Sequence, residues 1–115
     1  MELRHGARAA FTLADPSTKV AAVQALWDQR ETLDLDTQAL LEAPAYPGRP
    51  PQPVLVLPKE VPRRSPYTAL GHASLVHSIA HIEFNAINLA LDAIWRFAGM
   101  PPDYYRDWLL SLIHI

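Results

Sequence analysis

The sequence predicts an all-α fold, and three observations support this prediction. Asp15-Pro16 and Ser65-Pro66 each place a capping residue directly before a proline, which is the pattern of a helix start. The stretches after these starts carry apolar residues at helical spacing. The one strand-like run, at 54–57, is bracketed by prolines, and no other segment of the chain is suited to pair with it.

The composition is that of a small soluble protein. The 115 residues fit one domain, 50% of them are hydrophobic and 19% are charged. A net charge of −2 gives no basic field for nucleic acid, and the lack of cysteine excludes disulfides and thiolate metal sites. The N-terminus has no apolar secretory region, and charged residues interrupt the longest apolar stretch. We therefore expect a cytoplasmic protein that binds neither membrane nor nucleic acid.

The first segment, residues 1–43, is expected to be helical. A helix is predicted over 16–31, where Val23 and Trp27 belong to one apolar face. The stretch 32–43 is expected to add another turn or two.

The second segment, residues 44–66, holds eight of the eleven prolines. Each proline removes a backbone donor and restricts the residue before it, so this segment is not helical. We expect an extended, polyproline-like strap that lies over another surface. Recognition of the segment as a proline-rich ligand is the alternative.

The third segment contains the longest predicted helix. It runs from Ser65-Pro66 to Gly99, where glycine followed by two prolines is a strong stop signal. The length between these signals is about 33 residues, or about 50 Å of helix. Gly71 marks an alternative start, and Pro102 opens a further helix.

Glu83 lies at the centre of the apolar stripe of this long helix. On a helical wheel, the apolar side chains within about 40° of Glu83 belong to Val76, Ile79, Ile87, Ala90, Ile94 and Phe97. The opposite side is polar and includes Asn88 and Asp92. A buried carboxylate is costly unless it is paired or binds a metal. The wheel thus indicates that Glu83 binds a metal or acts in catalysis. The alternatives are that Glu83 forms a buried ion pair with an arginine of another helix, or that the apolar stripe is not deeply buried.

His77 and His81 are four residues apart, which is a spacing with which two imidazoles on one helix can bind a metal. They lie roughly 120° to 160° from Glu83, so the three residues do not form one site on a straight helix. Hydrogen bonds to the strap or to a partner helix are the competing interpretation. His72 shares the stripe of Glu83 but lies three turns away.

The HxxAHIE motif at 77–83 and the following residues 85–87 resemble an uncharacterised ferritin-like family, a domain of unknown function. That family shares its fold with the di-iron tRNA hydroxylases. Residues 15–19 and 61–64 agree with the same family, in the same order along the chain. The resemblance covers nearly everything up to Leu109.

A ferritin-like di-iron site takes one Glu from each of two helices and a Glu-x-x-His pair from each of the other two. The resemblance implies that Glu83 is the single Glu of its helix and a ligand of iron, or of manganese, in the intact protein. The Glu-Glu-x-x-His segment that it implies after Asp103 is missing. Glu2-x-x-His5 has a suitable spacing, but it lies in an N-terminus without a cap signal and is interpreted as chance.

The last six residues, 110–115, read LSLIHI. This is one translated frame of a transposase-adapter sequence that is common in sequencing libraries. We therefore expect a non-native tail, so His114 is not a candidate ligand. A genuine apolar C-terminus is the alternative.

These observations predict an N-terminal fragment of a ferritin-like four-helix bundle. Residues 67–109 would hold the first bundle helix and the start of the second, and the expected partners are the missing helices of the same bundle. The full-length protein is expected to be a di-iron carboxylate protein with O₂-dependent oxidase or hydroxylase activity, whereas the fragment alone is expected to be inactive and to self-associate through its apolar stripe. The alternative is a non-catalytic helical module in which Glu83 is a buried ion-pair partner.

Overall fold

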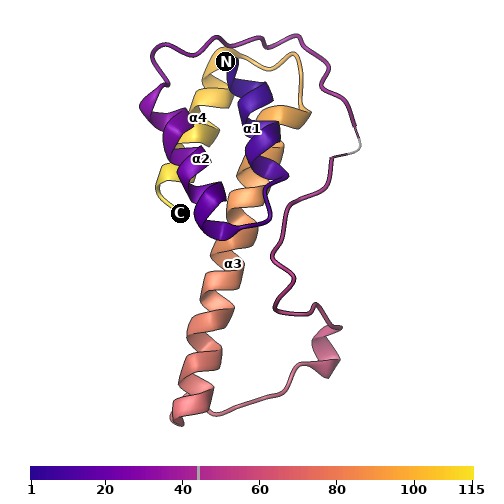
Figure 1. Cartoon of the computed structure of the whole chain (residues 1–115), viewed down its shortest axis with the longest axis vertical. Coiled ribbons are helices and arrows are strands. Elements are labelled where there is room, and N and C mark those ends of the chain that lie inside the picture. The colour runs from indigo at the N-terminus through magenta and orange to yellow at the C-terminus, as the bar shows by residue number, and fades with distance from the viewer. Residues whose placement is uncertain (44) are drawn as a thin grey trace.

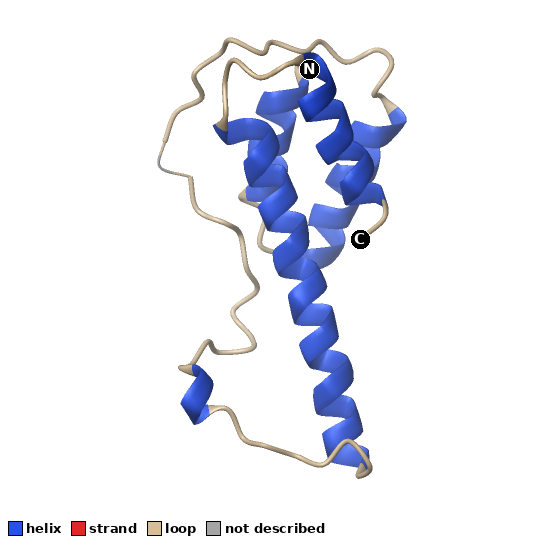
Figure 2. Ribbon diagram, turned by 180° about the vertical axis from the view of Figure 1, so that it is seen from behind, coloured by secondary structure: helices blue, strands red, loops and turns tan. Residues whose placement is uncertain are grey.

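The computed structural model describes residues 1–43 and 45–115, and these residues form helices and loops without a β-strand (Figures 1 and 2). The all-α prediction is confirmed. Pro44, the first residue of the predicted strap, lies outside the described part of the chain. The helices are α1 (Leu3–Phe11), α2 (Pro16–Asp28), the short 3-10 helix η1 (Pro58–Glu60), α3 (Ala69–Arg96) and α4 (Pro102–Ile113).

The core lies where α1, α2 and α4 pack with the C-terminal half of α3. Each of the four helices contributes fully buried apolar side chains, which is how amphipathic helices stabilise one another. The largest contributions come from Leu3, Phe11, Leu26, Leu91, Ile94, Trp95, Tyr105, Leu109 and Leu112.

The N-terminal half of α3 projects beyond this bundle (Figure 1). The molecule measures 49 × 27 × 22 Å and has a radius of gyration of 16.3 Å. A compact domain of this length would have a radius of gyration of about 13 Å. The difference arises because most of residues 69–87 lie outside the bundle and are exposed or half-buried.

The chain begins with a helix that the sequence analysis did not identify. The carboxylate of Glu2 accepts hydrogen bonds from the backbone N–H groups of Arg4 (3.0 Å) and His5 (2.9 Å), and it thereby caps α1. Interpreting the N-terminus as uncapped was therefore wrong. The prediction for α2 is confirmed, since the Asp15 carboxylate accepts from the Thr18 N–H at 2.9 Å and the helix starts at Pro16.

Residues 32–43 do not add a helical turn, contrary to expectation. The carboxylate of Asp36 accepts from the backbone N–H groups of Gln38 (3.0 Å) and Ala39 (3.2 Å), a local turn that competes with helix formation. Arg4 holds this turn from α1, because its guanidinium donates to the carbonyl oxygens of Asp36 (3.1 Å) and Ala39 (2.5 Å). α2 itself ends at Asp28, before the expected residue 31.

α3 starts later than the proline signal suggested. Thr68, rather than Ser65, caps the helix, because the Thr68 hydroxyl oxygen accepts from the Gly71 N–H at 3.0 Å. At the other end, the Arg4 guanidinium donates to the carbonyl oxygens of Ile94 (3.2 Å) and Trp95 (2.8 Å). This buried cation satisfies carbonyl groups that a helix C-terminus leaves free.

Residues 45–66 are extended apart from η1, as expected for a proline-rich segment (Figure 2). Residues 51–66 are exposed, so the expectation that the strap lies over another surface stays a prediction. Residues 54–57 of the strap form no strand. The predicted helix after Pro102 is also present, and it continues through residues 110–113 of the expected tail, where Leu112 is buried in the core. In the described part of the chain, no helix is both long and apolar enough to cross a membrane.

Candidate functional site

Glu83 lies on the half of α3 that projects from the bundle, and its side chain is exposed. Val76 and Ile79, which precede it on the predicted stripe, are exposed as well, with exposed fractions of 53% and 52%, whereas Ala90 and Ile94 further along the stripe are buried. No ion pair among the described residues includes Glu83. The chain therefore provides neither the deep burial nor the arginine partner that the sequence analysis considered.

The buried face of α3 is not centred on Glu83. It is formed in the C-terminal half by Leu91, Ile94 and Trp95, with Asn88 beside them at 5% exposure. The wheel placed Asn88 on the solvent side, and that placement was wrong. The reason is that the core includes only the C-terminal half of the helix, so the apolar pattern of the whole helix does not define its packed face (Figure 1).

Asn88 is buried because two other segments satisfy its polar atoms. Its side-chain oxygen accepts a hydrogen bond from the Lys19 ammonium group of α2, and its side-chain nitrogen donates to the Gly48 carbonyl oxygen at 3.3 Å. Lys19 also donates to the Phe11 carbonyl oxygen at 2.8 Å, and the Gly48 N–H donates to the same oxygen at 2.8 Å. This network, called the Lys19 network below, ties α1, α2 and α3 to the start of the strap.

Lys19 is fully buried and has no carboxylate partner among the described residues. Burial lowers the pKa of its ammonium group from 10.5 to about 8, because the charged form loses hydration. The ring of Phe84 lies 5.2 Å from the ammonium nitrogen, a distance that allows a cation–π interaction. Sequence reasoning did not identify Lys19 as a buried charge.

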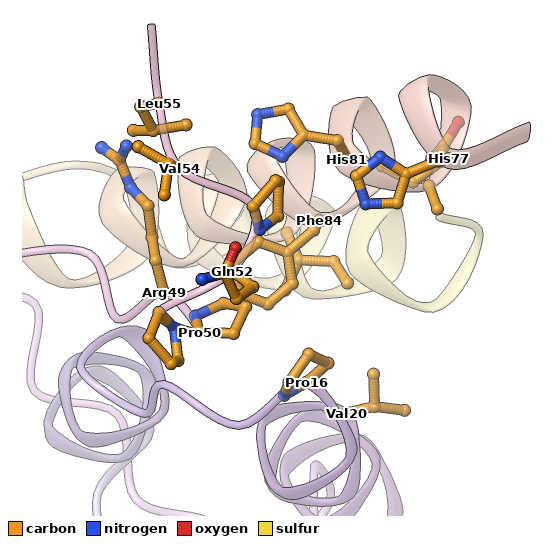
Figure 3. Close-up of a pocket in the computed structure, with 15 residues that line it drawn as sticks. Pro16, Val20, Arg49, Pro50, Gln52, Val54, Leu55, His77, His81 and Phe84 are labelled. Carbon is orange, nitrogen blue, oxygen red and sulfur yellow. The ribbon is translucent and has the colours of Figure 1, made fainter. Parts of the chain in front are cut away.

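A cleft of about 680 Å³ opens between α3, the strap and the start of α2 (Figure 3). The strap contributes residues 49–55, and α2 contributes Pro16 and Val20. Its lining is mainly apolar, as is usual for ligand sites, with a few polar groups on α3 and the strap. The sequence alone did not predict this cleft, because it depends on the path that the strap takes past α3.

Three residues highlighted by the sequence analysis line this cleft, namely His77, His81 and Glu83. In Figure 3, the imidazole rings of His77 and His81 are neighbours on α3, with Gln52 of the strap and Phe84 nearby. The expected hydrogen bonds from these histidines to the strap are not formed within the described residues. His72, by contrast, is exposed and does not line the cleft.

The remaining candidate donors lie elsewhere. His5 contacts the Glu2 carboxylate at 2.7 Å, next to the α1 cap. The imidazole of His114 lies 2.8 Å from the Leu110 carbonyl oxygen. Across residues 1–43 and 45–115, no group of three or more His, Cys, Asp or Glu residues is placed to hold a metal ion.

Comparison with known proteins gives two similarities. A family profile described as "Protein of unknown function (DUF455)" matches residues 12–112. An uncharacterized protein of Haemophilus influenzae is 40% identical over 112 aligned residues, and this alignment covers 87% of the present chain. The chain spans only 39% of the length of that relative. No solved structure matches the chain.

Proposed function

The chain belongs to the DUF455 family of proteins of unknown function, and from this premise we propose that it forms part of a longer ferritin-like helical protein in which Glu83 is one ligand of a metal centre. The metal would be an iron pair or manganese, with O₂-dependent oxidase or hydroxylase activity as the reaction class. The remaining ligands would come from helices outside the described residues.

The projecting half of α3 is the main support for this proposal. Besides Val76 and Ile79, it exposes large side chains such as Ile82, with 64% of its surface accessible. A helix with apolar side chains on several faces is usually buried in a larger assembly. The greater length of the Haemophilus relative is compatible with additional helices that cover this part of α3.

Glu83 lies within the surface that such helices would cover. If they pack against Val76 and Ile79, they also remove water from the carboxylate one turn further along the same face. An unpaired buried carboxylate is costly, so a cation must then neutralise it. Hard oxygen ligands of this kind suit iron and manganese.

The described residues alone do not fit an iron pair. The other carboxylate of α3, Asp92, lies on the opposite side of the helix and is bound to Arg96, with an oxygen-to-nitrogen distance of 2.6 Å. Glu83 is therefore a single donor where a di-iron site needs several. The proposed centre depends on ligands that this segment does not supply.

Iron analysis of the full-length polypeptide tests the proposal. We expect iron or manganese to co-purify with the wild-type protein and to fall at least about tenfold in Glu83→Ala, since removal of a ligand should cost at least as much as loss of a supporting residue. Asp92→Asn on the same helix is the matched control and should retain the metal. Equal metal content in the wild type and Glu83→Ala would refute the role of Glu83.

A non-catalytic helical module is the second candidate, and the exposed apolar face of α3 favours it equally. In that case Glu83 would pair with an arginine of a covering helix, and metal content would be negligible in every variant. Analytical ultracentrifugation of the present chain addresses the exposed face directly. We expect self-association, and a monodisperse, cooperatively melting monomer would contradict the idea that α3 lacks its covering helices.

A further inference from the structure

We propose that His77 and His81 bind a divalent transition-metal ion in the cleft between α3 and the strap, at a site separate from Glu83. This inference does not rest on the function proposed above, because it uses other residues and another class of ion. The ions concerned are of borderline softness, such as zinc, nickel or copper, which imidazole ligands suit.

The backbone of α3 places the two imidazoles correctly for chelation. α3 is helical without interruption from Ala69 to Arg96, so residues 77 and 81 lie one turn apart on one face. Two histidines at this spacing are a recurrent way for a helix to present two ligands to zinc. Ala80, which also lines the cleft, has a side chain too small to obstruct the space near them.

The ring nitrogens of both histidines are free to bind an ion. Among the described residues, neither ring makes a hydrogen bond or an ion pair. His81 is half-buried and His77 is exposed, so an ion can reach the pair from solvent. By comparison, the imidazole of His5 is engaged by Glu2 at 2.7 Å and that of His114 lies against a carbonyl oxygen.

The cleft also leaves room for the remaining ligands of the ion. Two imidazoles fill only part of the coordination sphere, so water or an exogenous ligand would occupy the other positions. Gln52 of the strap lines the same cleft, and its amide oxygen is a neutral donor (Figure 3). Arg49 is the only permanently charged cation among the lining residues, and it is exposed, so its side chain can turn into solvent.

Calorimetric titration of the present chain with nickel chloride, and separately with zinc chloride, tests this site. We expect one saturable site in the wild type, and an affinity at least about tenfold weaker in His77→Ala and in His81→Ala. His72→Ala is the matched control, since His72 is an exposed histidine of the same helix outside the cleft, and it should bind as the wild type does. Far-UV circular dichroism of each variant verifies that α3 is intact.

Three outcomes would overturn the proposal. The first is wild-type affinity in either single variant of the pair, and the second is an equal loss in His72→Ala. The third is loss of nickel binding in Glu83→Ala with retention in His81→Ala, which would assign the ion to Glu83. The reverse pattern, with nickel binding retained in Glu83→Ala, supports the histidine site whatever the iron content of the full-length protein proves to be.

Discussion

The buried ammonium group of Lys19 should make the stability of this protein rise with pH above neutrality. The pKa of this group is about 8 in the folded chain and 10.5 at its ordinary value. Between these values the unfolded chain binds more protons than the folded chain, so raising the pH favours folding. The linkage relation gives a cost of charge burial of about 3 kcal/mol at about pH 7 and about 1 kcal/mol at about pH 9.5.

Lys19→Met removes the charge and keeps much of the side-chain volume. At about pH 7, relief from charge burial offsets the loss of hydrogen bonds, because an unsatisfied acceptor such as the Asn88 side-chain oxygen costs about 1–3 kcal/mol. We therefore expect the free energy of unfolding of Lys19→Met to lie within about 2 kcal/mol of the wild-type value at that pH. Raising the pH to about 9.5 stabilises the wild type but not the variant. The free energy of unfolding of the variant, relative to that of the wild type, should therefore be about 2 kcal/mol lower at about pH 9.5 than at about pH 7.

Urea denaturation followed by circular dichroism at the two pH values measures this difference. Lys59→Met is the control, because Lys59 is the only other lysine of the chain and is exposed on η1. Its stability relative to the wild type should not change with pH. If the free energies of unfolding of the wild type and Lys19→Met differ by the same amount at both pH values, the assignment of Lys19 as a buried charge is refuted.

Three further substitutions probe other parts of the fold. Glu2→Gln should cost about 1 kcal/mol near neutral pH in urea denaturation, as for a lost helix cap. Burial raises the pKa of the Glu2 carboxyl, but the N–H donors of Arg4, Asp36 and His5 lower it more, so the cost should shrink as pH falls below 4.5. Gly48→Ala should lower the melting temperature more than Gly99→Ala. A Cβ at residue 48 collides with the Leu13 carbonyl group, whereas a Cβ at residue 99 meets open space and is disfavoured only by the φ of 79°. Leu112→Ala should cost about 2–4 kcal/mol, since Leu112 is 3% exposed, and an unchanged melting temperature would show that the end of α4 does not belong to the core.

Local signals in the sequence were sufficient to locate three of the four α-helices that the described residues form. Pro16 and Pro102 are the first residues of α2 and α4, because proline suits the first turn of a helix and hinders continuation from before it. α1 was missed because its cap is Glu2, a residue less typical of this position than Asp or Ser. The capping contact of Glu2 therefore had no recognisable sequence pattern.

The candidate site was predicted only in part, because its geometry depends on distant segments. The wheel placed Glu83 and the pair His77 and His81 on different sides of α3, whereas all three residues line the same cleft. It also assumed one packed face along the whole of α3. Packing at only one end of the helix moved the buried face toward Leu91 and allowed Asn88 to be buried against Lys19. Neither the Lys19 network nor the cleft could be derived without the path of the chain in space.

The contacts of Arg4 have a consequence for synthesis of the chain. Arg4 belongs to the first helix, but two of its hydrogen-bond acceptors are the carbonyl groups of residues 94 and 95, some 90 positions later. At about 5–20 residues per second, a ribosome needs about 5–18 seconds to add the intervening residues. During that interval the guanidinium of Arg4 and the apolar face of α1 lack their final partners. The contacts of α1 with α3 therefore cannot form before α3 is synthesised. Until α3 emerges, the nascent chain is accessible to chaperones and proteases.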